Sequence, residues 1–170
     1  DMKISDYIAK FLKTKGIDLV FVITGAGNIR LIESIKNEGI DYVCTHHEQA
    51  SVMSAIARHR VNNLPAVCIV TGGPGAANTV IGLADAYLDS IPCLIIAGQE
   101  KQEYVQNPNK QTRGLGVQGL NMVEITNTIT KYSVCLDEPR NIGLILEKSF
   151  YHMNSDRPGP VWIEIPQDLQ

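Results

Sequence analysis

The feature that most constrains the fold is a hydrophobic pattern that switches repeatedly between two periods along the chain. Ile4, Ile8 and Phe11 recur at the spacing of one helix face. By contrast, residues 19–23 and 66–70 are short, continuous apolar runs that are typical of buried strands. Helical segments that alternate with such strands predict a parallel sheet covered by helices on both faces. We therefore expect an α/β fold with a single doubly wound, mostly parallel sheet of about six strands.

The same pattern predicts the order of the elements along the chain. Strands are expected over residues 19–23, 41–44, 66–70, 93–97, 131–136 and 161–165. Helices are expected over residues 4–12, 29–36, 48–60, 76–88 and 140–153. The stretch 99–121 is polar, carries several glycines and shows little periodicity. A loop of that length inside a compact domain is usually functional or mobile.

Composition excludes several classes of function. The chain has 170 residues, which is enough for one good core and too short for two comfortable domains. A net charge of −3 and a pI near 5.8 argue against nucleic-acid binding, which requires a basic face. No run of roughly eighteen apolar residues is present to span a membrane. The four cysteines form no metal-ligand spacing, so we expect reduced, packed cysteines in a cytoplasmic protein.

A carboxylate and a glycine-rich turn follow two neighbouring strands. Glu48 comes just after the strand expected at 41–44, and Gly72 and Pro74 belong to a turn that follows the strand at 66–70. Because the carboxyl ends of parallel strands meet at one edge of a sheet, these residues predict a ligand crevice. Asn78, one helical turn further on, points toward the same edge. Taken alone, Glu48 could also be a first-turn helix acid favoured by the helix dipole.

Other familiar sites fit the residues less well. Gly25 and Gly27 suggest a dinucleotide fingerprint, but Arg30 stands where that motif needs a third small residue. The glycine turn at 72–75 is not followed by the Lys-Ser/Thr pair of a P-loop. His46 and His47 are adjacent and cannot share one coordination face, so we expect no metal site. A nucleophile elbow of the form Gly-x-Ser-x-Gly is also absent from the sequence.

Taken together, the chain resembles the N-terminal, pyrimidine-binding domain of thiamine-diphosphate-dependent enzymes, and acetolactate synthase-like large subunits above all. The resemblance is colinear over essentially the whole chain. The matching stretches are residues 20–21 with Gly25, 47–50, 71–78, 82–90, 123–126 and 159–166.

The resemblance implies thiamine diphosphate as the cofactor and assigns roles to individual residues. Glu48 would hydrogen-bond a nitrogen of the aminopyrimidine ring and favour the imino tautomer, which removes the acidic proton of the thiazolium ring. Gln118 would reach the substrate, so Glu48 and Gln118 are the expected catalytic residues. The remaining cofactor-binding residues would be Gly25 at the face between subunits, Gly72, Pro74 and Asn78. His47 would at most contact these residues and would not contact the cofactor.

Two departures leave the exact reaction open. Val117 stands where the family usually has an aromatic residue before the glutamine, and 23–26 reads Ile-Thr-Gly-Ala in place of Tyr-Pro-Gly-Gly. Both positions shape the substrate side. A carboligase and a decarboxylase acting on a 2-oxo acid therefore fit equally well. A flavin (FAD) is compatible with the resemblance, but no residue indicates it.

The family holds the cofactor's diphosphate through Mg²⁺ in a separate domain with a Gly-Asp-Gly motif, and this chain has no such motif. We therefore expect residues 1–170 to be one domain, either the N-terminal part of a longer chain or the small subunit of a two-subunit decarboxylase. Alone it should be inactive. The resemblance implies a homodimer or homotetramer in which the diphosphate-binding domain of another subunit completes the site. A non-catalytic oligomerisation or regulatory domain of the same fold is the alternative.

Overall fold

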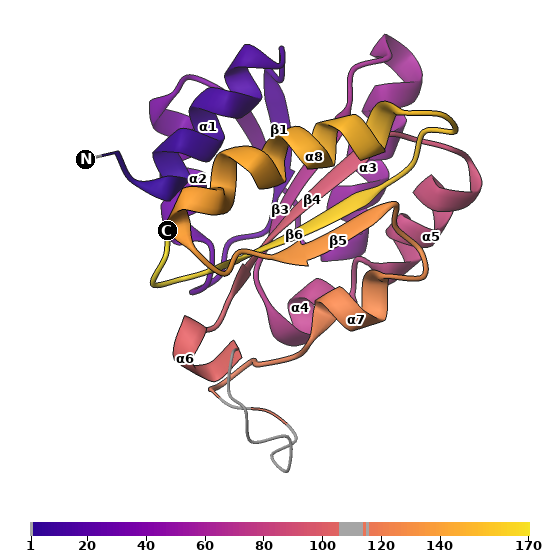
Figure 1. The fold of residues 1–170 in the computed structure, drawn as a ribbon. Coiled ribbons are helices and arrows are strands. Elements are labelled where there is room, and N and C mark those ends of the chain that lie inside the picture. The colour runs from indigo at the N-terminus through magenta and orange to yellow at the C-terminus, as the bar shows by residue number, and fades with distance from the viewer. Residues whose placement is uncertain (1, 106–113, 115) are drawn as a thin grey trace.

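The computed structural model describes residues 2–105, 114 and 116–170 and contains a six-stranded sheet (Figure 1). The sheet order is β2-β1-β3-β4-β6-β5, and every neighbouring pair of strands is parallel. The strands are β1 Leu19–Val22, β2 Asp41–Cys44, β3 Ala66–Val70, β4 Cys93–Gln99, β5 Tyr132–Cys135 and β6 Val161–Pro166. The expected parallel sheet of six strands is confirmed.

Helices cover both faces of this sheet. Helices α1, α2 and α8 contribute to one apolar core, and α3, α4, α5 and α7 contribute to a second core on the opposite face. In Figure 1, α1 and α8 lie along one face, while α4 and α7 lie together at the lower edge. The helices are α1 Ile4–Thr14, α2 Ile29–Asn37, α3 Glu48–Asn62, α4 Gly73–Ala77, α5 Val80–Leu88, α6 Gln102–Val105, α7 Met122–Thr126 and α8 Ile142–Asn154, with a 3₁₀ turn η1 Pro139–Asn141.

The central strands are apolar on both sides because both of their faces are covered. Val67 and Ile69 of β3 belong to the core under α1, α2 and α8, whereas Cys68 and Val70 belong to the other core. This alternation follows from the two-residue period of a strand. Every residue of β3, β4 and β6 is buried, whereas the edge strand β2 is exposed. Their burial explains why continuous apolar runs predicted these strands from the sequence.

A crevice forms between β1 and β3, where the connections to the next strands leave toward opposite edges of the sheet. After β1 the chain passes through α2 to β2 on one side, and after β3 it passes through α4 and α5 to β4 on the other. The two connections leave the sheet over opposite faces, because α2 and α4 belong to different cores. The carboxyl ends of β1 and β3 therefore border an open space, which is where ligands bind in doubly wound sheets.

The structure differs from the expected elements at two places near this crevice. The helix expected at 76–88 is two helices, because α4 begins at Gly73 and ends at Ala77, and α5 begins only at Val80. The polar stretch at 99–121 is not wholly irregular, since it contains α6. Within that stretch, residues 106–113 and 115 lie outside the described residues.

The cysteines differ in their exposure. All four cysteines are free thiols, and Cys44 is exposed on β2, so the expectation that every cysteine is packed is wrong for Cys44. Burial raises the pKa of the Cys93 thiol to about 12, which keeps it protonated. Within the described residues, no helix is long and apolar enough to cross a membrane. The same residues contain no cluster of three His, Cys, Asp or Glu side chains that could hold a metal ion.

Candidate functional site

The turn after β1 is held in shape by one buried amide. Asn28 is completely buried, its Oδ1 accepts a hydrogen bond from the backbone N–H of Gly25 (2.9 Å), and its Nδ2 donates to the carbonyl of Ile23 (2.8 Å). Gln170 then donates from its Nε2 to the carbonyl of Gly27 (2.6 Å). These bonds satisfy backbone groups that the turn would otherwise leave unpaired. They fix the backbone of Gly25 at the edge of the crevice.

The turn after β3 is packed too closely for side chains. A Cβ on Gly72 would lie 2.7 Å from the carbonyl oxygen of Gly98, at the end of β4. Gly73 has a φ of +63°, and a Cβ there would lie 2.5 Å from the carbonyl oxygen of Gln118. A positive φ is accessible at low cost only to glycine. The two glycines therefore bring the turns after β3 and β4 and residue 118 into direct contact.

Thr71 lies between the turns and touches both. A Cβ on Gly25 would lie 2.6 Å from the Cβ of Thr71, and a Cβ on Gly75 would lie 3.0 Å from its Cγ2. Thr71 is 8% exposed, and its Oγ1 is buried without a hydrogen-bond partner in the part of the chain that the structure describes. Its side chain is thus the common wall between the turn after β1 and the first turn of α4.

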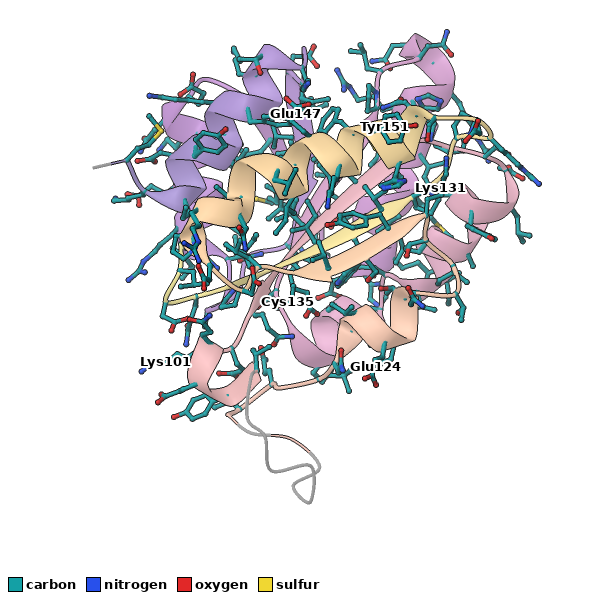
Figure 2. The ribbon with its side chains drawn as sticks, in the orientation of Figure 1. Lys101, Glu124, Lys131, Cys135, Glu147 and Tyr151 are labelled. Carbon is teal, nitrogen blue, oxygen red and sulfur yellow. The ribbon has the colours of Figure 1, made fainter. Side chains whose placement is uncertain are left out.

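A cavity of about 400 Å³ opens between these turns. Its wall consists of the turns after β1, β3 and β4, and residues 117 and 118 close one side. Three of the residues predicted from the sequence line it: Gly25, Gly72 and Gln118. Figure 2 labels Lys101 and Glu124, two exposed residues on the lower side of the view. Lys101 follows directly after Glu100, which lines the cavity. The cavity is large enough to enclose part of a small organic ligand.

The other three predicted residues form a group beyond Gly75. Glu48 is the first residue of α3 and is half-buried, and Asn78 donates from its Nδ2 to Oε2 of Glu48 (2.9 Å). A Cβ on Gly75 would lie 3.0 Å from Oε1 of Glu48, so that glycine makes room for the carboxyl group. Pro74 is exposed in the first turn of α4, and its carbonyl accepts from the backbone N–H of Asn78 (3.2 Å). The Asn78 amide therefore orients the Glu48 carboxyl group.

The start of α3 explains why Glu48 stands where it does. His47 is the N-cap residue with extended backbone, and its Nδ1 accepts from the backbone N–H of Gln49 (3.2 Å). This cap satisfies one of the free N–H groups at the helix start. A carboxyl group in the first helical turn is also favoured by the helix dipole. The helix-start interpretation of Glu48 and its place beside Asn78 are thus compatible.

The structure adds residues that the sequence did not single out. Thr71 and Asn28 shape the crevice, but a threonine after a strand and an asparagine before a helix are common and carry no specific signal. Gln99, at the end of β4, is 3% exposed and lines the cavity. Behind it, burial raises the pKa of Glu164 to about 7, with smaller opposing effects from the polar groups of Gln99 and Trp162. Glu164 lies in the strand expected at 161–165, but its burial was not singled out from the sequence.

The chain matches a family of known domains and several curated proteins. Residues 2–128 match the family model described as "Thiamine pyrophosphate enzyme, N-terminal TPP binding domain". Acetolactate synthase 2 of Brassica napus is 35% identical over 98% of this chain and 25% of its own length. The acetolactate synthase large subunit of Lactococcus lactis is 34% identical, over 97% of this chain and 28% of its own.

A third relative gives the same picture. The acetolactate synthase isozyme 2 large subunit of Escherichia coli is 31% identical over 98% of this chain and 29% of its own length. The chain therefore spans between a quarter and a third of the length of these three proteins.

Proposed function

Because the chain belongs to the family of N-terminal thiamine pyrophosphate-binding domains, we propose that it holds the aminopyrimidine ring of that cofactor at the crevice between β1 and β3. The observation that carries the proposal is the hydrogen bond from Asn78 to Glu48 beside the first turn of α4. It holds a half-buried carboxyl group in one orientation at the crevice edge, next to a cavity of about 400 Å³.

The residues present fit the ring. An aminopyrimidine offers ring nitrogens and an amino group, which pair with carboxyl and backbone groups. Oε2 of Glu48 accepts the hydrogen bond from Asn78, while Oε1 faces Gly75. Because Gly75 has no side chain, it does not cover Oε1. A carboxyl group can accept or, when protonated, donate a hydrogen bond. Pro74 adds an exposed apolar surface next to it. Gly25 and Gly72 present backbone at the cavity wall.

We propose that Glu48 shares a proton with a nitrogen of the ring and that Asn78 keeps its carboxyl group aligned for that exchange. When bound, the cofactor would supply an acidic carbon that, once its proton has been removed, could add to the carbonyl group of a 2-oxo acid and take up the electron pair left by decarboxylation. Gln118 lines the cavity, and we propose that it contacts the substrate. Positioned proton transfer of this kind accelerates reactions by roughly 10²- to 10⁴-fold.

The complete enzyme would be an acetolactate synthase-like transferase or lyase that acts on a 2-oxo acid as a carboligase or decarboxylase. We propose that the diphosphate and its Mg²⁺ are held by a diphosphate-binding domain of another subunit in a homodimer or homotetramer. The alternative, in which this chain is a separate small subunit, predicts the same residue roles. A cytoplasmic location stays a prediction from the sequence, and a role for FAD stays open.

The variant Glu48→Gln tests the proposal in the complete enzyme that contains this domain. The amide cannot share a proton with the ring, so hydrogen–deuterium exchange at the acidic carbon of the bound cofactor should slow by about 100-fold or more. The exchange is followed by NMR after acid quenching. Glu147→Gln is the matched control, since Glu147 lies on α8 (Figure 2), across the sheet, and pairs with Lys15 at the surface.

The result also separates the two classes of function. Unchanged exchange in Glu48→Gln would contradict the proposed role. If substitution of both Glu48 and Asn78 left the activity of the complete enzyme intact, the chain would instead be a non-catalytic oligomerisation or regulatory domain.

A further inference from the structure

Glu100 follows directly after β4 and accepts two hydrogen bonds from the backbone of a distant segment. Its Oε1 receives the N–H of Val117 (3.0 Å) and the N–H of Gln118 (2.8 Å). Bonds from N–H groups to an ionised carboxyl group are stronger than bonds between neutral partners. A single side-chain oxygen therefore fixes two consecutive peptide groups of the segment that closes the cavity.

Close packing restricts both the Glu100 side chain and the backbone of Gln118. Gly116 has a φ of +73°, and a Cβ there would lie 2.6 Å from Cδ of Glu100. On the other side, the backbone and Cβ of Gln118 lie against Gly73, where an added Cβ would meet the carbonyl oxygen of Gln118 at 2.5 Å. The Glu100 carboxyl group and the first turn of α4 thus hold Gln118 from two directions.

Gln99, which precedes Glu100, makes a second contact with the same segment. Gln99 is 3% exposed, and its Nε2 donates to the carbonyl of Leu120 (3.0 Å) while its Oε1 accepts from the N–H of Glu100 (2.9 Å). Gln99 belongs to β4, one of the fully buried strands. Two successive residues at the end of a rigid strand therefore anchor residues 117, 118 and 120.

We infer that Glu100, which lines the same cavity, is a positioning residue that holds Gln118 at the cavity wall through the backbone. The inference rests on the proposed function, because it assigns Gln118 to the substrate side of the site. Both Val117 and Gln118 are exposed and line the cavity, so their orientation depends on the backbone that carries them. Supporting contacts of this kind matter because small displacements of a positioned group lower the rate strongly.

The variants Glu100→Ala and Glu100→Gln test the inference in the complete enzyme. Alanine removes the acceptor, and kcat/KM for the 2-oxo acid should fall by up to about 100-fold, because a misplacement of a positioned group by roughly 1 Å can cost that much. Glutamine keeps an oxygen that can accept both N–H groups without the charge, so it should recover most of that loss. Exchange at the acidic carbon of the cofactor should stay unchanged in both variants, because it depends on Glu48. General unfolding would lower both quantities.

A second measurement examines the contact itself without reference to catalysis. Hydrogen–deuterium exchange of the backbone amides of Val117 and Gln118 in the complete enzyme, localised by mass spectrometry of peptides after quenching, should be at least about 10-fold faster in Glu100→Ala than in the wild type. Glu103→Ala is the matched control, because Glu103 is an exposed glutamate on the adjacent α6. It should leave the exchange of these amides and kcat/KM unchanged.

The outcomes distinguish this inference from the proposed function. Unchanged amide exchange in Glu100→Ala, or a loss of kcat/KM that glutamine does not restore, would overturn the role of Glu100. If the amides of Val117 and Gln118 exchange faster but kcat/KM is unaffected, the contact exists but positions no functional group, and the inference also fails. By contrast, a normal cofactor exchange rate in Glu48→Gln would reject the proposed function and leave the amide result standing.

Discussion

The position of the Thr71 side chain limits how much space the residues of the crevice can occupy. Its Cβ, Oγ1 and Cγ2 lie within 2.9 Å of the position that a Cβ on Gly25 would occupy. The turn after β1 can approach β3 only because that atom is missing. Asn28 fixes the same turn through two hydrogen bonds, so the backbone of Gly25 has no easy direction in which to move. The close approach of the two turns, rather than one reactive side chain, creates the cavity wall.

We predict that Gly25→Ala destabilises the protein by about 1–3 kcal/mol, the usual cost of inserting a methyl group into a close-packed site. All three atoms that the new Cβ would meet belong to Thr71, whose β-branched side chain is itself buried. Urea unfolding of wild type and variant measures the difference in the free energy of unfolding.

Gly159→Ala is the matched control for this substitution. A Cβ at Gly159 would meet only the side chain of Lys131, at 3.1 Å, so this neighbour would have to shift less than Thr71 would for a Cβ at Gly25. The expected loss of unfolding free energy is therefore the smaller of the two, below about 1 kcal/mol. Equal effects of the two substitutions would show that the contact with Thr71 does not restrict residue 25.

At the scale of the elements, the sequence predicted most of the fold because each central strand is apolar on both faces. The strand at 66–70 was placed correctly for this reason, and β3 is indeed buried along its whole length. The division of residues 76–88 into α4 and α5 was not predicted, because Gly, Ala and Asn residues there give no clear period. The contact between Glu100 and residues 117–118 was also beyond prediction, since it joins positions that only the folded chain brings together.

For the candidate site, the sequence predicted the residues but not how they are grouped in the structure. Glu48 and the glycine turn follow two strands that are successive in the chain, and this indicated a shared edge, although β1 lies between β2 and β3 in the sheet. Their separation into a cavity group and an Asn78 group depends on Thr71, which lies between them. No pattern in the sequence marks Thr71 for that position. Local chemistry therefore identified the residues, whereas packing decided how they are grouped.

The break between α4 and α5 is held by a side chain that bonds to the backbone. Thr79 is completely buried, and its Oγ1 donates to the carbonyl of Ala76 (2.7 Å), which also accepts from the N–H of Thr79 (3.0 Å). Bonds to the carbonyl three residues earlier tighten the end of a helix. Asn78 lies inside this tightened turn and reaches Glu48 from it.

We predict that Thr79→Val lowers the free energy of unfolding by about 1 kcal/mol, the typical contribution of one hydrogen bond. It should also weaken cofactor binding by the complete enzyme, measured by calorimetry, because the turn that carries Asn78 keeps its backbone bonds but loses the side-chain bond that tightens it. Thr14→Val is the control, since Thr14 makes the same kind of bond (2.7 Å) to Phe11 at the end of α1, in the opposite layer. Equal losses of cofactor affinity in both variants would contradict a specific role for the break.

At the scale of the whole molecule, one carboxyl group lies inside the sheet that joins the two layers. Glu164 of β6 is 2% exposed and pairs in register with Ala97 of β4 and Cys135 of β5. Its Oε1 and the Nε1 of Trp162 have no hydrogen-bond partner among the described residues. Burial raises the pKa of Glu164 from 4.5 to about 7, because water no longer stabilises its charged form.

This pKa has a defined consequence for stability. Because the pKa is raised on folding, the native state binds more protons than the unfolded state between pH 4.5 and about pH 7. The free energy of unfolding therefore falls as pH rises through this window. The contribution is fully present below pH 4.5 and is lost above about pH 7. The shift corresponds to a change on the order of 3 kcal/mol.

We predict that Glu164→Gln removes this part of the pH dependence, since an amide does not titrate. The variant should be more stable than the wild type at about pH 8, by up to roughly 3 kcal/mol, and should lose that advantage at about pH 5. Urea unfolding can be followed by the fluorescence of Trp162, which is the single tryptophan and lies two positions away on β6. Glu147→Gln controls for removing an exposed carboxyl group. If Glu164→Gln and the wild type showed parallel pH profiles, Glu164 would be ionised equally in the folded and unfolded chains, and the buried charge would have to be compensated by the polar groups around it.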